Sequence, residues 1–244
     1  MPKFAVIVAA AGKAERFGGE EKKTFAKLDG RPVFLRCLEL FVTRPDVAQT
    51  ILSVAPEDLA MVKSTYGPNL AFMNVRLAEG GVKRSDTVRA ALQHVAEDVE
   101  FVAVHDAARP CATHEMIDAV FAESVKSGAA ILASPVVGTL KKVSGAHVIE
   151  QTVSRDGLYE AQTPQVFRKD VLVRAMEAQA ASGDEVTDDA QAVERIGHPV
   201  SIVPSDWTNL KITTRPDLTL AAAILKARPI KAAPKMGAFE EAKW

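Results

Sequence analysis

Apolar runs and amphipathic stretches alternate along the chain. Short continuous apolar runs predict strands buried on both faces, and they lie at 4–9, 50–55, 73–78, 100–104, 129–135 and 200–204. Apolar residues at helical spacing predict helices at 33–42, 56–66, 88–97, 113–127, 168–181 and 215–226. A further strand is expected at 209–214 and a further helix from Thr187. The alternation predicts an α/β protein with a mostly parallel sheet flanked by helices.

Turn and capping residues set the expected boundaries of these elements. Residues 67–69, with the sequence Gly-Pro-Asn, are expected to end the second helix, and Gly128 is expected to end the fourth. Thr187 is predicted to cap the helix that follows it. Two polar turns, at 152–158 and 161–165, are expected to lead the chain back to the core.

A β-hairpin interrupts this pattern. Residues 136–152 have strand character with turn residues at Gly138 and at 144–146, so an inserted β-hairpin arm is expected at about 136–156. An isolated hairpin must bury its face against something, and a second copy of the chain is a natural partner. We find no internal repeat and no clear linker, so residues 1–228 are expected to form one domain and 229–244 a flexible tail.

Composition excludes several classes of protein. The 244 residues carry a formal net charge of −1, whereas a protein that coats nucleic acid needs a basic excess. Cys37 and Cys111 are the only cysteines and have no metal-ligand spacing, and none of the five histidines forms an H-x-x-x-H pair. No apolar run reaches the length of a membrane span. A cytoplasmic protein without structural zinc is therefore expected.

The turn after the first strand has the features of a phosphate site. Ala10, Ala11 and Gly12 leave room for backbone N–H groups to approach an anion, and Arg16 and Lys23 add positive charge. The loop matches neither the Walker motif nor the dinucleotide G-x-G-x-x-G motif. An ordinary turn with solvated charges is the alternative interpretation.

A second loop repeats these features. Gly80 and Gly81 are followed by Arg84 and Thr87 at the start of a predicted helix, which makes a second possible phosphate cradle. The alternative is a plain loop with a serine or aspartate N-cap.

Asp106 stands out among the carboxylates because it directly follows an apolar run and lies beside small alanines. Open α/β sheets bind ligands at the carboxyl ends of their strands. A partly buried carboxylate there needs a partner such as a metal ion, a hydroxyl group or Arg109. A structural pair between Asp106 and Arg109 is the alternative.

The polar residues expected at strand ends are mostly cationic. They are Arg16, Lys23, Arg84, Asp106, Arg109 and Lys211, with hydroxyl groups from Thr87, Thr163 and Thr187. This set fits a polyanionic ligand handled with one divalent cation. No nucleophile with an adjacent base stands out, whereas phosphoryl or nucleotidyl transfer needs only positioning and charge stabilisation.

Residues 4 to about 225 resemble the 2-C-methyl-D-erythritol 4-phosphate cytidylyltransferases of the non-mevalonate isoprenoid pathway. The resemblance rests on Ala-Ala-Gly at 10–12 with Arg16 and Lys23, Gly-Gly-x-x-Arg-x-Asp-Thr-Val at 80–88 and Val-His-Asp-Ala-Ala-Arg-Pro at 104–110. It continues with Thr-Val-x-Arg-x-Gly-Leu at 152–158, Thr-Pro-Gln at 163–165, Thr-Asp at 187–188 and Asn-x-Lys-Ile-Thr at 209–213. Each motif is weak alone, and the set in this order is specific.

The resemblance implies a Rossmann-like nucleotidyltransferase fold and transfer of CMP from CTP to methylerythritol phosphate with Mg²⁺. The residues it implies for CTP binding are Ala10, Ala11, Gly12, Gly81, Arg84 and Thr87. The catalytic residues that it implies are Arg16, Lys23, Arg155 and Lys211. The acceptor-binding residues that it implies are Asp106, Ala107, Arg109, Thr139, Arg155, Thr163, Thr187 and Lys211. Asp106 is the one protein ligand suggested for a Mg²⁺ ion held largely by the CTP phosphates.

The resemblance also implies a homodimer in which the arms are exchanged, so that Thr139 and Arg155 reach the neighbour's site. Arg155 could equally be a solvated surface residue. The chain departs from the family pattern at Ala14, Lys22 and Val82, where the family usually has glycine, proline and aspartate. Two alternatives stay open, a ribitol 5-phosphate cytidylyltransferase and a non-catalytic binder of nucleotides or phosphosugars.

Overall fold

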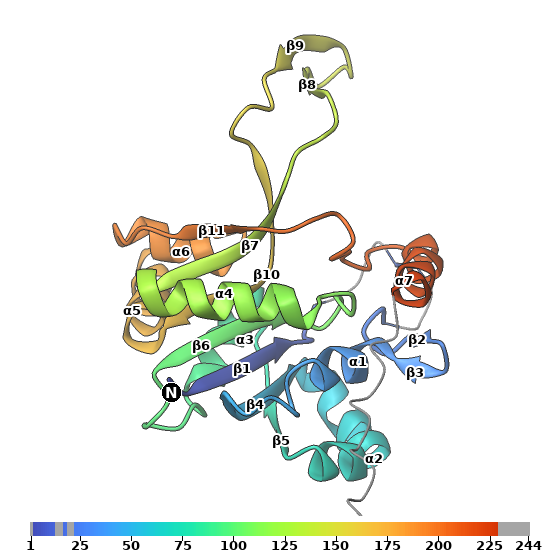
Figure 1. The fold of residues 1–244 in the computed structure, drawn as a ribbon, viewed down its shortest axis with the longest axis vertical. Coiled ribbons are helices and arrows are strands. Elements are labelled where there is room, and N and C mark those ends of the chain that lie inside the picture. The colour runs from blue at the N-terminus through green and yellow to red at the C-terminus, as the bar shows by residue number, and fades with distance from the viewer. Residues whose placement is uncertain (1, 13–16, 19–21, 229–244) are drawn as a thin grey trace, which may run out of the picture.

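The computed structural model describes residues 2–12, 17–18 and 22–228, and it is built around a seven-stranded sheet (Figure 1). The strand order is β11-β7-β10-β6-β1-β4-β5. Strand β10 runs antiparallel to both of its neighbours, and every other pair in the sheet is parallel. The predicted α/β class with a mostly parallel sheet is confirmed.

The strands of this sheet are β1 (Phe4–Ala9), β4 (Val47–Val54), β5 (Val75–Glu79), β6 (Phe101–Asp106), β7 (Ala129–Pro135), β10 (Tyr159–Arg168) and β11 (Ser201–Pro204). Two small hairpins are formed by β2 (Lys27–Leu28) with β3 (Arg31–Pro32) and by β8 (Leu140–Val143) with β9 (Ile149–Val153). The helices are α1 (Val33–Glu39), α2 (Pro56–Phe72), α3 (Arg84–Leu92), α4 (His114–Ser127), α5 (Lys169–Ser182), α6 (Asp189–Arg195) and α7 (Arg215–Ala227).

The sheet separates two apolar layers. Because successive strand residues point to opposite faces, Val6 and Val8 of β1 pack into one cluster and Ala5 and Ile7 into the other. The first cluster includes residues of α1, α2, α4 and α7, and the second includes residues of α3, α5 and α6. The burial of β1 on both faces explains its continuous apolar sequence.

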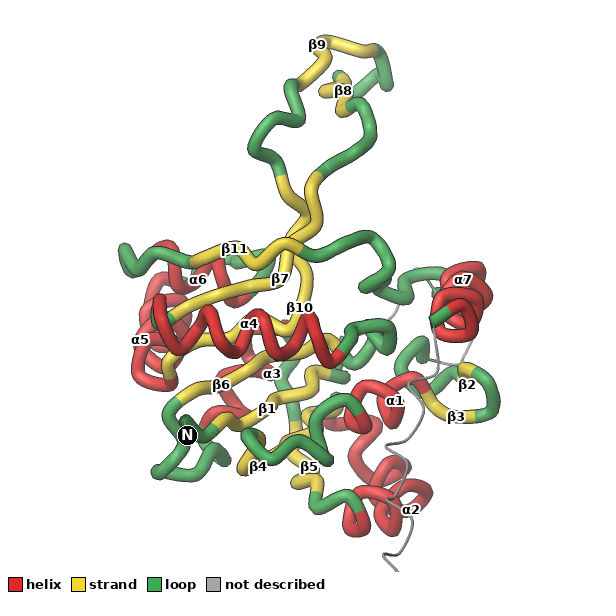
Figure 2. Tube along the Cα trace, in the orientation of Figure 1, coloured by secondary structure: helices red, strands yellow, loops and turns green. Residues whose placement is uncertain are grey.

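The predicted arm projects well beyond the sheet (Figure 2). Its strands β8 and β9 pair only with each other, and the chain enters from β7 and returns into β10. Val137, Val148 and Ile149 on this arm are exposed. The inserted hairpin is therefore confirmed, and these apolar side chains stay exposed within the described part of the chain.

Helix α2 is longer than its sequence indicates. It was expected to end at residues 67–69, but it continues through Pro68 to Phe72. An internal proline costs a helix about 3 kcal/mol. The buried side chain of Leu70 follows the proline, and Tyr66 packs edge-on against Phe34 in the core. Burial of one large apolar side chain contributes about 1.5–3 kcal/mol, so tertiary packing offsets the local signal.

Strand β10 replaces the polar turn expected at 161–165. Gln162, Thr163 and Gln165 are buried in it, although each is polar. Partners distant in sequence satisfy them: Asn209 donates to Gln162, and Gln165 donates to the Asp188 carboxylate. Buried polar side chains are stable when they are hydrogen-bonded, and local sequence does not reveal such partners.

Three smaller predictions were also wrong. Residues 209–214 form a loop, in which the Ile212 amide donates to the Ala108 carbonyl, 2.8 Å away. Asp188, not Thr187, caps α6, because its side chain accepts from the Gln191 amide. Helix α3 ends at Leu92 rather than near residue 97.

None of the helices in the described part of the chain has the length and apolar character of a membrane span.

Candidate active site

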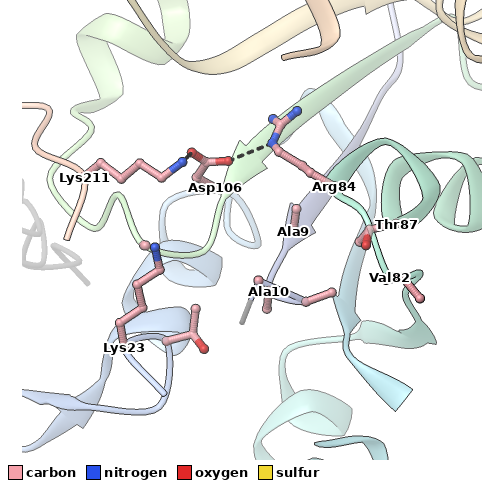
Figure 3. A pocket seen from close by; sticks show the side chains of 12 residues that line it. Ala9, Ala10, Lys23, Val82, Arg84, Thr87, Asp106 and Lys211 are labelled. Atoms are coloured by element: carbon pink, nitrogen blue, oxygen red, sulfur yellow. Dashed lines mark hydrogen bonds and ion pairs between the residues drawn. The ribbon is translucent and has the colours of Figure 1, made fainter. Parts of the chain in front are cut away.

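A cavity opens at the carboxyl ends of β1 and β6, beside the loop between β5 and α3 (Figure 3). Its lining residues are Ala9, Ala10, Ala11, Gly12, Lys23, Thr24, Val82, Arg84, Thr87, Asp106, Ala108 and Lys211. Most of the residues predicted for a nucleotide site therefore meet at one cavity. Ligands of open α/β sheets bind at this edge.

The small-residue loop begins directly where β1 ends. The Ala10 amide donates to the Ser53 carbonyl on β4, 2.7 Å away, which holds the start of the loop against the sheet. Ala11 is partly exposed and Gly12 is exposed, and both line the cavity. Arg16 and Ala14 lie outside the described residues, so the predicted catalytic role of Arg16 stays a prediction.

Lys23 enters the cavity from the far end of the same loop. Figure 3 shows its side chain on the opposite side of the cavity from Arg84 and Thr87. The preceding residue, Lys22, forms ion pairs with Asp58 at 2.6 Å and Glu57 at 2.9 Å. These carboxylates lie in the first turn of α2. Lys22, which stands where the family usually has proline, therefore fastens the loop end next to Lys23.

The second predicted cradle depends on two glycines. A Cβ atom at Gly81 would lie 2.3 Å from the Asp86 Cβ, and one at Gly80 would lie 2.9 Å from the Ala11 Cβ. A side chain at Gly80 would therefore push this loop away from the loop at 10–12, and one at Gly81 would clash with the first turn of α3. The Gly81 amide donates to the Thr87 hydroxyl at 3.2 Å, and this hydroxyl lies 3.0 Å from the Lys83 carbonyl that it can donate to.

Thr87 thus closes the loop onto α3, while its side chain lines the cavity. The alternative of a serine or aspartate N-cap is wrong, since Lys83 occupies the cap position and makes no side-chain cap bond. Val82 is 81% exposed and also lines the cavity. It presents an apolar side chain without hydrogen-bonding groups to any ligand there.

Asp106 is the centre of the charged cluster. Its carboxylate contacts the Lys211 ammonium at 2.6 Å and the Arg84 guanidinium at 3.2 Å, and Arg109 Nε is 3.8 Å away (Figure 3). Burial by itself would raise the pKa of Asp106, but Arg84 and Lys211 outweigh it and hold that pKa far below its ordinary value. Asp106 is therefore ionised throughout the physiological range.

Arg84 links this cluster to a second carboxylate. Its NH1 atom lies 2.7 Å from Asp189, whose side chain is 1% exposed. Burial lowers the pKa of Arg84, but Asp189 and Asp106 more than reverse that effect, and its pKa is raised overall. Burial raises the pKa of Asp189. Asp189 could not be recognised from its sequence context, because an aspartate at the start of a helix normally indicates only capping.

Thr163 and His105 form a hydrogen-bonded chain that supports the backbone of Asp106. The Thr163 hydroxyl accepts from the Asp106 amide at 3.0 Å and lies 3.2 Å from His105 Nδ1. His105 Nε2 lies 3.0 Å from the Arg109 carbonyl, which can only accept a hydrogen bond. The neutral tautomer with a proton on Nε2 satisfies every group, because Thr163 then donates to Nδ1. Burial lowers the pKa of His105 to about 4.

We expect His105 to make the protein less stable as pH falls from about 6.5 to about 4. In this window the unfolded chain binds a proton on the imidazole and the folded chain does not, so folding stability rises with pH. The shift corresponds to at most about 3 kcal/mol. Urea unfolding of the wild type and the His105→Gln variant at several pH values tests this, and equal pH slopes for both would contradict it.

A second cavity shares a wall with the first. It is lined by Arg84, Asp106, Arg109, Ala161, Gln162, Thr163, Gln165, Thr187, Asp188 and Lys211. The side chains of Arg84, Asp106 and Lys211 border both cavities. The predicted acceptor residues Arg109, Thr163 and Thr187 therefore lie together, next to the cavity predicted for CTP.

Three predicted acceptor residues lie elsewhere. Ala107 is fully buried and lines neither cavity, and its amide donates to the Ala9 carbonyl. Thr139 and Arg155 are exposed residues of the arm, where Arg155 donates to the Val137 carbonyl. The arm projects away from the sheet (Figure 1), and neither residue lines either of the two cavities described above.

The suggested Asp106–metal contact finds little support in this geometry. Both carboxylate oxygens of Asp106 contact cations of the protein, and the described residues include no group of three or more His, Cys, Asp or Glu side chains that could hold a metal ion. A hard cation such as Mg²⁺ binds through oxygen ligands and commonly through substrate phosphates. The cation-rich cavity fits a metal that arrives on a phosphate ligand.

Small-residue loops and clustered cations at the carboxyl edge of a mostly parallel sheet form a site suited to a phosphorylated ligand such as a nucleotide. The comparison with known families gives the class of protein, a nucleotidyltransferase. Residues 4–227 match the family model described as IspD, 2-C-methyl-D-erythritol 4-phosphate cytidylyltransferase. The chain belongs to this family.

Relatives and solved structures agree with this assignment. The chain is 41% identical to the 2-C-methyl-D-erythritol 4-phosphate cytidylyltransferase of Rhodopirellula baltica, over 91% of this chain and 94% of the relative. It is 40% identical to that of Dechloromonas aromatica, over 93% of this chain and all of the relative. The structure resembles the Thermus thermophilus enzyme with a TM-score of 0.77 and 30% identity, covering 93% of this chain and 100% of that one.

The chain is thus a transferase that makes CDP-methylerythritol from CTP and methylerythritol phosphate in isoprenoid precursor biosynthesis. The predicted activity is confirmed. Of the alternatives left open by the sequence, neither the ribitol phosphate enzyme nor the non-catalytic binder is favoured by these comparisons.

Proposed function

We propose that the first cavity binds CTP and the second binds methylerythritol phosphate, with Arg84, Asp106 and Lys211 between the two substrates. The small-residue loop at 10–12 and the glycine pair at 80–81 leave room for the nucleotide and its phosphates. Arg109, Thr163 and Thr187 border the acceptor side. The shared wall supports this arrangement, because a transfer between two phosphorylated substrates needs their phosphates side by side.

In this arrangement a phosphate oxygen of the acceptor attacks the α-phosphorus of CTP. A new P–O bond forms while the bond from the α-phosphorus to the β-phosphate oxygen breaks, and the electron pair leaves with pyrophosphate. Lys23 and Lys211 stabilise the negative charge that builds up on the phosphate oxygens, which is the main catalytic contribution available without a nucleophile. Arg16 adds to this charge by the family resemblance.

Mg²⁺ is the expected cofactor and would be carried by the CTP phosphates. When bound, it neutralises charge on the triphosphate and favours departure of pyrophosphate. The described residues contribute cations around that complex and no carboxylate set of their own. Omission of Mg²⁺ is therefore expected to abolish activity through the substrate and to leave the fold intact.

We propose that the enzyme is a homodimer with exchanged arms. Thr139 and Arg155 then complete the acceptor cavity of the neighbouring subunit. The observation that supports this proposal is the exposed position of both residues on an arm that points away from its own cavities. The apolar side chains of the arm, including Val148 and Ile149, would gain a packing partner in such a dimer. Residues 1–228 form one domain in this proposal, and a cytoplasmic location stays a prediction.

Mixing two defective variants tests the exchanged arms. Arg155→Ala removes an arm residue and Lys23→Ala removes a cavity residue, and each homodimer has two damaged sites. In a mixed dimer with exchanged arms, one site carries both defects and the other carries none. Random assortment at equal concentrations should therefore restore about a quarter of wild-type activity, measured as pyrophosphate release from CTP, Mg²⁺ and methylerythritol 4-phosphate after refolding the mixture.

Activity equal to the mean of the two single variants would contradict the exchange. A sedimentation measurement on the same samples shows whether they are dimers. A wild type that is dimeric and active, with no gain from mixing, would place Arg155 outside the neighbour's site. Ribitol 5-phosphate, offered in place of methylerythritol 4-phosphate, serves as the control acceptor and should release little pyrophosphate.

A further inference from the structure

Arg84 is held between two carboxylates from different elements. On one side, its Nε donates to Asp106 at the end of β6, 3.2 Å away, and on the other its NH1 lies 2.7 Å from Asp189 in α6. Arg84 itself begins α3. Arg84 therefore links α3 to both β6 and α6. Helix α6 itself has no residue in the lining of the first cavity.

Asp189 is an unusual residue because its carboxylate is buried. Its side chain is 1% exposed, and neither carboxylate oxygen has a well-directed hydrogen bond within the described part of the chain. A buried carboxylate without a partner is strongly destabilising. Arg84 is the only cation for which an ion pair with Asp189 is found among these residues. Arg84 is therefore the partner that favours the charged form of Asp189, against the effect of burial.

Hydrogen bonds of the two residues that flank Asp189 hold the start of α6 in place. The preceding residue, Asp188, caps α6 and accepts from the Gln165 side chain at 2.8 Å, and the Ala190 amide donates to the same glutamine at 3.0 Å. Gln165 belongs to the central strand β10. The start of α6 is therefore anchored to the sheet, and Asp189 is a rigid support for whatever it contacts.

Without Asp189, Arg84 would have one carboxylate left. Arginine carries several rotatable bonds, and an arginine paired only with Asp106 is free to turn toward substrate phosphates or to fold onto that carboxylate. A guanidinium held from two opposite sides has one position. Arg84 borders both cavities, so a fixed guanidinium presents the same group to each of them.

We propose that Asp189 is a positioning residue for the transfer reaction, which acts by holding Arg84 in the wall between the two substrate cavities. This inference rests on the proposed placement of CTP and acceptor. Asp189 itself borders neither of the two cavities, so it is expected to affect substrate binding only indirectly. The route proposed for its influence on both substrates is the ion pair with Arg84.

The first test is steady-state kinetics of Asp189→Asn, which removes the charge and keeps the shape. The KM values for both CTP and methylerythritol 4-phosphate should rise about tenfold, with a smaller change in kcat. A loosened α6 would instead affect the acceptor alone, because Thr187 and Asp188 line only the acceptor cavity of the two. A rise limited to the acceptor KM would therefore overturn the proposal. Glu194→Gln, an exposed change on the same helix, is the matched control and should leave both KM values unchanged.

The second test is a double-mutant cycle with Arg84→Met, which keeps the apolar stem of the arginine. In the Arg84→Met background, Asp189→Asn should cause no further change in either KM, since the residue through which it acts is absent. The melting temperature, unlike the KM values, should respond to Asp189→Asn in the Arg84→Met background, and it should rise. Arg84→Met alone leaves a buried, unpaired carboxylate and should lower it by several degrees, and adding Asp189→Asn should restore part of that loss.

These outcomes separate the inference from the proposed function. If Arg84→Met leaves both KM values unchanged, Arg84 binds neither substrate, and the placement of the substrates is wrong together with the inference. If Arg84→Met raises the KM values but Asp189→Asn acts equally in both backgrounds, only the inference is overturned. Coupling in the melting temperature without any kinetic effect of Asp189→Asn also overturns it, because the ion pair would then serve the fold alone.

Discussion

Replacing Lys23 with alanine is expected to lower kcat by about 100- to 1,000-fold with a much smaller change in the KM values for CTP and acceptor. Lys23 lies across the cavity from Arg84 and Thr87, where the triphosphate is proposed to bind (Figure 3). A cation that acts most strongly on the charge of the transition state contributes to turnover more than to ground-state binding. Rapid-quench or coupled pyrophosphate assays at saturating substrate measure this directly.

The neighbouring lysines make the experiment specific. Lys22 is engaged with Asp58 and Glu57, so its own substitution disturbs the anchoring of the loop. Lys63→Ala, an exposed change on α2, removes one positive charge without touching the cavity and should retain full activity. Unchanged turnover in Lys23→Ala would remove this lysine from the mechanism and leave Arg16 and Lys211 as the proposed charge-stabilising residues.

Replacing Asp106 with asparagine is expected to reduce kcat/KM for the acceptor by about 1,000-fold, the loss expected for a central charged group of a catalytic site. Lys211 and Arg84 both depend on this carboxylate for their position. Once it is neutral, both cations are free to bind substrate phosphates in unproductive positions. Tighter binding of the substrates combined with slower turnover would be a direct sign of that change.

The same variant has a defined effect on stability against pH. Burial by itself raises the pKa of Asp106, but Arg84, Lys211 and Arg109 lower it well below the value of an unfolded aspartate. The stabilisation from the ionised carboxylate is therefore complete above about pH 4, the pKa of an unfolded aspartate, and is lost as pH falls below it. The difference in unfolding free energy between wild type and Asp106→Asn should shrink between about pH 5 and pH 3. A difference that is constant over that range would show that Asp106 is not the stabilising charge.

The sequence predicted the parts of the fold that depend on local pattern. The apolar runs of β1, β6 and β7 and the amphipathic pattern of α4 needed no tertiary information. Prediction from local sequence was wrong where contacts with residues distant in sequence determine the secondary structure. Strand β10 carries buried glutamines whose hydrogen-bond partners come from the start of α6 and the loop at 205–209. It also carries Thr163, whose hydroxyl contacts β6. Helix α2 crosses a proline because Leu70 is buried beyond it.

The site shows the same division. Lys23, Arg84, Asp106 and Lys211 were found because they follow apolar runs or small-residue loops, and they meet at one cavity. Asp189 and His105 were not assigned any role, since a helix-start aspartate and a histidine within a strand are ordinary in a sequence. Their importance depends on burial and on the contacts with Arg84 and Thr163, which only the folded chain provides.

The antiparallel strand β10 has a consequence for how the chain folds during synthesis. It fits between β6 and β7, which both precede it in sequence. Until residues 159–168 leave the ribosome, β6 and β7 each present an unpaired edge with an open slot between them, and unpaired strand edges attract other chains. The arm is synthesised after β7 and before β10, while these edges are unpaired. Thr163, which supports Asp106, reaches its place only when β10 pairs with β6, so the support of Asp106 depends on the insertion of β10 between β6 and β7.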